Sequence, residues 1–159
     1  MTVRASAASE GVCNIAEPRT GLEAKFSLRH TVAMALAGVD TAGLDAFSDM
    51  AVYAPEVVAL RERVKVLLAP QCPELTLSEV VIETQSGAVL RQRHDSGRPA
   101  SDLMEQQQSL EEKFRRLVKS VLTPDESDEL IDLVARLDEL TDLSPLAGML
   151  ARQACVVPH

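Results

Sequence analysis

The spacing of hydrophobic and polar positions changes twice along the chain. Up to about residue 63 the spacing is helical, and Ser27 stands as an N-cap before an apolar helix that ends near Gly38. Short apolar or alternating runs then predict strands over residues 64–68, 79–84 and 88–93. Because turn residues occupy positions 85–87, the last two strands are expected to form a hairpin.

After the strands the spacing is helical to the end of the chain. Two pairs of residues have the spacing of a capping box: Ser109 with Glu112, and Thr123 with Glu126. In a capping box the side chain of each residue accepts a hydrogen bond from the backbone N–H of the other. These pairs predict helices that begin at Ser109 and Thr123. A last short helix is expected from Ser144 onward.

Helices, then strands, then helices predict an α+β fold: a small, mostly antiparallel sheet with helices packed on one face, followed by C-terminal helices. Residues 1–10 are small and polar, which is typical of a flexible lead-in. We therefore expect the α+β domain to span residues 11–108 and the C-terminal helices to span residues 109–155.

Charge and composition exclude several classes of protein. The net charge of −8 and the four aromatic side chains argue against a nucleic-acid-binding surface. Eight acidic residues and one basic residue lie between Thr123 and Leu143, which indicates one solvated helical face. No apolar run reaches the roughly 18 residues of a membrane span. Three cysteines without short spacing, and no secretory signal at the start, favour a reducing cytoplasm.

Residues 18–30 carry the densest candidate chemistry. Cations and His30 gather where a loop enters the helix that Ser27 caps, and a helix N-terminus favours a bound carboxylate. The same dipole disfavours imidazolium, so His30 is expected to stay neutral and able to accept a proton. A solvent-exposed group of basic residues is the alternative interpretation.

Other candidates are weaker. His94 precedes Asp95 at the end of a predicted strand, where the pair suits either acid–base work or a solvent-facing turn. Cys13 suits a buried structural thiol. The sequence has no glycine-rich phosphate loop and no paired histidines at helical spacing.

Residues 18–28, Pro-Arg-Thr-Gly-Leu-Glu-Ala-Lys-Phe-Ser-Leu, precede an Ala-rich helix and resemble the signature of the MmgE/PrpD family. The resemblance continues in order through residues 47–49, 55–57, 61–66, 97–99 and 112–114, and it covers Gly11 to about Leu140. The family includes 2-methylcitrate dehydratases, cis-aconitate decarboxylases and iminodisuccinate epimerases.

The resemblance implies a chorismate-mutase-like lid domain whose closing helices return to a large helical domain absent from this chain. It implies removal of a proton α to a carboxylate in small di- or tricarboxylates, without a cofactor. Family dehydratases and decarboxylases carry a Tyr where this chain has His30, which makes His30 the candidate catalytic residue. Lys25, Ser27 and Arg29 are the candidate substrate-binding residues. The family's other catalytic residues lie in the helical domain.

Two functions remain open at this stage. In the first, the chain is the C-terminal domain of a cytoplasmic lyase or isomerase, completed by a helical domain and expected to form a homo-oligomer. In the second, it is a non-catalytic isolated domain that acts as an association module through its apolar helix faces.

Overall fold

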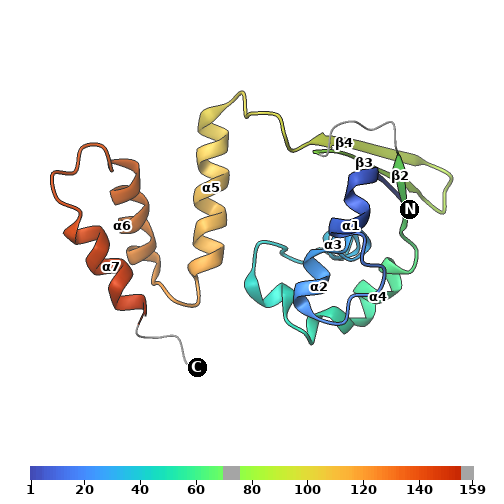
Figure 1. Ribbon diagram of the computed structural model, residues 1–159, viewed down its shortest axis with the longest axis horizontal. Coiled ribbons are helices and arrows are strands. Elements are labelled where there is room, and N and C mark those ends of the chain that lie inside the picture. Colours follow the sequence, from blue (N-terminus) through green and yellow to red (C-terminus); the bar gives the residue numbers. More distant parts are fainter. Residues whose placement is uncertain (70–75, 155–159) are drawn as a thin grey trace. The chain divides into compact units, whose positions relative to one another are not determined.

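The computed structural model describes residues 1–69 and 76–154, with side chains described up to residue 151. The chain divides into two compact units, Met1–Ser101 and Asp102–His159. Each unit is described by itself, and Figure 1 shows the elements of both.

A four-stranded sheet forms the framework of the first unit. Its strands are β1 (Thr2–Ser6), β2 (Lys65–Ala69), β3 (Leu77–Glu83) and β4 (Val89–Asp95), in the order β2-β1-β3-β4. The β1–β2 pair is parallel, whereas the β1–β3 and β3–β4 pairs are antiparallel. The α+β class and the mostly antiparallel sheet are thus confirmed, as is the hairpin, whose turn contains Gly87 at φ 84°.

The N-terminal residues differ from the flexible lead-in that the sequence analysis predicts for residues 1–10. Thr2–Ser6 form β1, an interior strand that pairs with β2 on one side and β3 on the other. Val3 is 2% exposed and Ala5 is also buried, whereas Arg4 forms an ion pair with Glu79 at 2.8 Å. The first ten residues continue through η1 (Ala7–Ser9) into α1 (Glu10–Cys13). They are ordered because two neighbouring strands take up the hydrogen-bonding groups of β1.

The helices of the first unit lie on one side of this sheet (Figure 1). They are α2 (Gly21–Lys25), α3 (Leu28–Leu36), η2 (Leu44–Phe47), η3 (Ala51–Tyr53) and α4 (Pro55–Arg61). A buried cluster of Ala33 and Met34 on α3 with Val57 on α4 holds the two longer helices together. Ser27 caps α3 and Gly38 follows it at φ 74°, as the sequence predicts.

Up to residue 154, the second unit consists of three helices: α5 (Leu103–Val118), α6 (Pro124–Ala135) and α7 (Ser144–Ala154). The capping box of Thr123 and Glu126 is present. The predicted helix start at Ser109 is wrong, because Asp102 caps α5 by accepting from Met104 N and Glu105 N. The helical unit therefore begins at Asp102, earlier than the predicted residue 109.

Candidate functional site

His30 is the buried titratable group of the candidate site. It lies in the first turn of α3, is 1% exposed, and its Nδ1 has no hydrogen-bond partner. Burial lowers the pKa of His30 below its usual value of 6.5, and the positive charge of Arg61 lowers it further. The imidazole is therefore neutral at pH 7, the form that can accept a proton or relay one.

Ser27 positions His30 through the helix cap. Its hydroxyl donates to the carbonyl oxygen of Ile15 at 2.6 Å and accepts from the backbone N–H of His30 at 3.2 Å. Ser27 is itself 1% exposed. The structure thus gives this hydroxyl a capping role, and substrate binding by Ser27 stays a prediction.

The two predicted cations have different surroundings. Lys25 is exposed, with its Nζ 5.4 Å from the centroid of the Phe47 ring, a cation–π contact. Arg29 lies beside His30 on α3 and is partly buried, and its Nε is covered and has no hydrogen-bond partner. Arg29 is therefore the more buried of the two, and substrate binding by either cation stays a prediction.

Arg61 is the residue that the sequence analysis does not single out. It ends α4, its charge acts on His30, and its Nη1 is buried without a hydrogen-bond partner. The available signal is helical spacing: Arg61 lies four positions after Val57, the residue by which α4 packs on α3. A basic residue on the apolar face of a helix, as Arg61 is on α4, is thus expected to point toward the protein interior.

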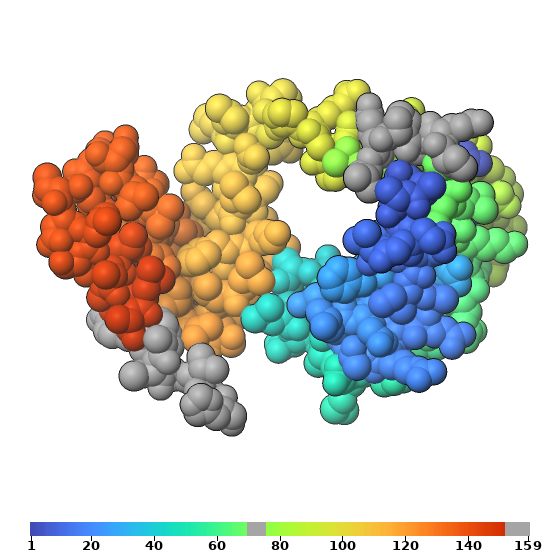
Figure 2. Space-filling view, in the orientation of Figure 1, coloured from blue at the N-terminus to red at the C-terminus, as the bar shows by residue number. Residues whose placement is uncertain are grey.

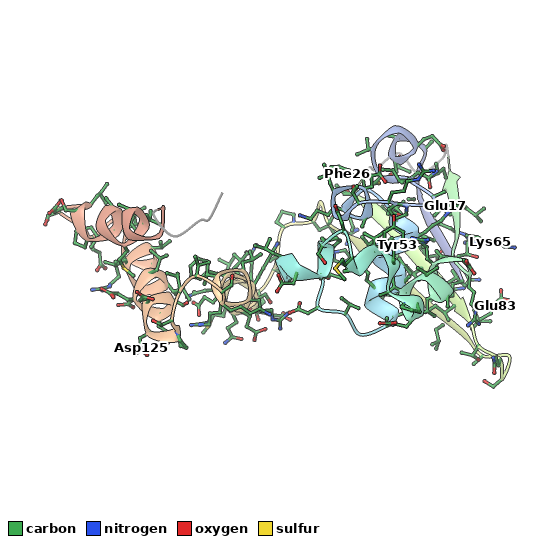
Figure 3. All side chains as sticks on the ribbon, turned by 90° about the horizontal axis from the view of Figure 1, so that it is seen from below. Glu17, Phe26, Tyr53, Lys65, Glu83 and Asp125 are labelled. Atoms are coloured by element: carbon green, nitrogen blue, oxygen red, sulfur yellow. The ribbon has the colours of Figure 1, made fainter. Side chains whose placement is uncertain are left out.

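The loop that leads to α3 is held by the residues of the family-like motif. Gly21 N donates to Asp49 Oδ1 at 2.7 Å, and Arg19 N donates to Glu23 Oε2 at 2.6 Å. The hydroxyl of Tyr53, labelled in Figure 3, donates to the carbonyl oxygen of Arg19 at 3.1 Å. Two motif blocks that are separate in the sequence therefore contact one another and fix the entry to α3.

His94 and Cys13 do not join this site. His94 is exposed on β4. Asp95 accepts from Gly97 N at 3.0 Å and pairs with Arg98 at 3.3 Å. A hydrogen bond from Thr76 and that from Gly97 are the main causes that lower the pKa of Asp95. His94 and Asp95 are the last two residues of β4, and the turn follows them at residues 96–97. Cys13 is a partly buried free thiol; Cys72 and Cys155 lie outside the described residues.

The second unit contributes a groove. Its walls enclose about 690 Å³ between α5, α6 and α7, and most of the lining side chains are apolar, among them Leu103, Leu110, Phe114, Leu130, Val134 and Leu150. The three helices run from yellow through orange to red in Figure 2. Leu110 remains 59% exposed. An apolar groove of this kind is suited to association.

Two further observations limit the chemistry. Among the described residues, no three His, Cys, Asp or Glu side chains gather as metal ligands. Within the same part of the chain, no helix combines the length and the hydropathy that crossing a bilayer requires.

Comparison with known proteins identifies the family. The model of the MmgE/PrpD C-terminal domain matches residues 2–139, from β1 past the end of α6. A search of the curated proteins finds no match. Members of this family are generally enzymes, dehydratases and other lyases. The sheet, the capped α3 and the motif loop all lie within the matched residues, and the chain belongs to the MmgE/PrpD family as its C-terminal domain.

Proposed function

We propose that this chain is the C-terminal domain of a lyase or isomerase that acts on small di- or tricarboxylates. The proposed reaction is abstraction of a proton α to a carboxylate with loss of water, as in 2-methylcitrate dehydratase. The observation that carries the proposal is His30, a buried neutral imidazole with an unpartnered Nδ1 in the first turn of α3. It lies within the residues that match the family.

In this mechanism His30 donates a hydrogen bond to the substrate or exchanges a proton with it. Neutral imidazole serves both purposes, because one ring nitrogen carries a hydrogen and the other has a lone pair. Arg29, with Lys25, supplies positive charge for the substrate carboxylates, and that charge stabilises the carbanion-like transition state. A helical domain supplies the remaining acid–base groups. We place this enzyme in the cytoplasm as a homo-oligomer, without a cofactor.

Reconstitution tests this function. The chain is mixed with the helical domain of a family dehydratase, and 2-methylcitrate dehydration is followed by the absorbance of the unsaturated product. His30→Ala should lower kcat/KM by roughly a hundred- to ten-thousandfold, the contribution of a positioned acid or base. His94→Ala, at an exposed histidine, is the matched control. Unchanged kcat/KM in His30→Ala would contradict the role of His30.

The apolar groove of the second unit favours a second candidate, a non-catalytic association module. Its exposed leucines would then contact a second copy of the chain. Sedimentation velocity separates the candidates. A module self-associates with micromolar or tighter affinity and restores no activity, whereas the enzyme domain restores activity when the helical domain is added.

A further inference from the structure

Buried nitrogen atoms without partners occur on both α3 and α4. They are Nε of Arg29, Nδ1 of His30 and Nη1 of Arg61. A buried polar group is normally hydrogen-bonded, and leaving a charged one unpaired is costlier than leaving a neutral one. The two arginine nitrogens are donors, and Nδ1 of His30 is a donor in the tautomer that carries its hydrogen there, so one acceptor could serve groups on both packed helices.

The missing acceptor is negatively charged. Among the residues that the structure describes, no carboxylate forms an ion pair with Arg29 or Arg61. Arg61 nevertheless lies close enough to His30 for its charge to act on the imidazole. Buried guanidinium groups are ordinarily balanced by an anion, and a carboxylate accepts from a guanidinium and a second donor at the same time.

We propose that Arg61 and His30 together bind one carboxylate group of the substrate. Nη1 of Arg61 donates to one carboxylate oxygen, and Nδ1 of His30, in the tautomer that carries its hydrogen there, donates to the other. Arg61 is partly buried and ends α4, so a change of its side-chain rotamer admits the carboxylate. The inference rests on the proposed function, since it names the position of one substrate carboxylate.

Binding of a carboxylate has a consequence for His30 that a purely structural Arg61 would not produce. The bound group neutralises the charge of Arg61 and accepts a hydrogen bond from the imidazole. Both changes favour imidazolium, so the pKa of His30 rises when the carboxylate is bound.

The test is an NMR titration of the full chain with citrate, in which the ring signals of His30 are followed over pH. A His30→Gln variant assigns the signals, and exposed His94 is the internal reference. We expect a saturable shift of the His30 signals and a rise of the His30 pKa. Sodium chloride at equal ionic strength and the uncharged trimethyl ester of citrate should produce neither change.

Variants of Arg61 identify the second donor. Arg61→Gln should weaken citrate binding by about ten- to hundredfold, the range for a hydrogen bond between charged groups. Arg61→Lys should restore part of the affinity. Arg63→Gln is the matched control, because Arg63 is exposed two residues beyond Arg61. Far-UV circular dichroism verifies folding, and if Arg61→Gln fails to fold, the comparison of citrate with its ester decides.

Two outcomes overturn the proposal. In the first, citrate shifts the His30 signals no more than its ester does. In the second, folded Arg61→Gln binds citrate as tightly as the wild type. Neither measurement needs turnover. A chain that binds no citrate but restores dehydration with the helical domain retains the proposed function and loses this site. A chain that binds citrate but restores no activity retains this site and loses the proposed function.

Discussion

At the scale of single residues, Gly21 is the position where the motif loop packs most closely against another backbone. A Cβ at this position would overlap the carbonyl oxygen of Phe47, so the two backbones approach more closely than any side chain permits. The same residue donates its N–H to Asp49. The close approach joins the loop to η2, and through α2 it fixes where α3 begins.

We therefore predict that Gly21→Ala destabilises the first unit by roughly 1–3 kcal/mol, the cost of overpacking a closely packed site. Tyr53 is the single tyrosine and there is no tryptophan, so tyrosine fluorescence during urea unfolding reports on this unit alone. Gly11→Ala is the control, because a Cβ there meets no atom within 4 Å. Equal unfolding midpoints for the two variants would contradict the close approach.

His30 makes the stability of the first unit depend on pH. Its pKa is lowered in the folded state, so the unfolded chain binds the proton more readily. This contribution to stability is present above about pH 6.5 and is lost as the pH falls through the folded pKa. The urea midpoint should therefore fall between about pH 7.5 and pH 5.5 in the wild type, and less steeply in His30→Gln. His94→Gln should keep the wild-type slope.

The sequence predicts the neutral state of His30 but not its causes. A helix N-terminus was the expected reason, whereas burial and the charge of Arg61 are the causes in the structure. The sequence analysis does not identify Arg61, because the charge of Arg61 comes near His30 only when α4 packs on α3. Local spacing reveals which side of a helix is buried, but not which side chain of another helix it meets.

At the scale of elements, the longer helices and the β3–β4 hairpin follow from caps, turns and apolar spacing. β1 does not, because five residues with two apolar positions give too short a pattern to separate from a polar lead-in. Ser109 fails for another reason. Its spacing to Glu112 matches a capping box, but Asp102 satisfies the free N–H groups about two turns earlier.

The position of β1 inside the sheet gives a direct prediction. Val3→Ala should destabilise the first unit by roughly 1–3 kcal/mol, because it removes apolar surface that is buried on folding and leaves a cavity. Val12→Ala is the matched control, since Val12 is 60% exposed. Tyrosine-monitored urea unfolding measures both. A flexible lead-in at residues 1–10 would instead make Val3→Ala as harmless as the control.

At the scale of the whole molecule, the candidate site and the apolar groove belong to different units. The candidate site of His30 and Arg61 lies within Met1–Ser101, whereas the apolar groove lies within Asp102–His159. The sequence analysis expects the C-terminal helices to begin at residue 109, whereas α5 begins at Leu103. No pattern in the sequence predicts the groove itself, because it depends on how three helices pack.

If the groove receives part of the helical domain in the proposed enzyme, changes in the two units should act on different kinetic quantities. Leu110→Asp places a charge on the apolar wall and should raise the concentration of chain needed for half-maximal reconstituted activity by about tenfold or more, while kcat at saturation is kept. His30→Ala should leave that concentration unchanged and lower kcat. Gln108→Asp adds the same charge at an exposed position of α5 outside the groove lining and controls for net charge. If Leu110→Asp and Gln108→Asp assemble equally well, the groove does not hold the helical domain, and the exposed leucines of α5 need another partner.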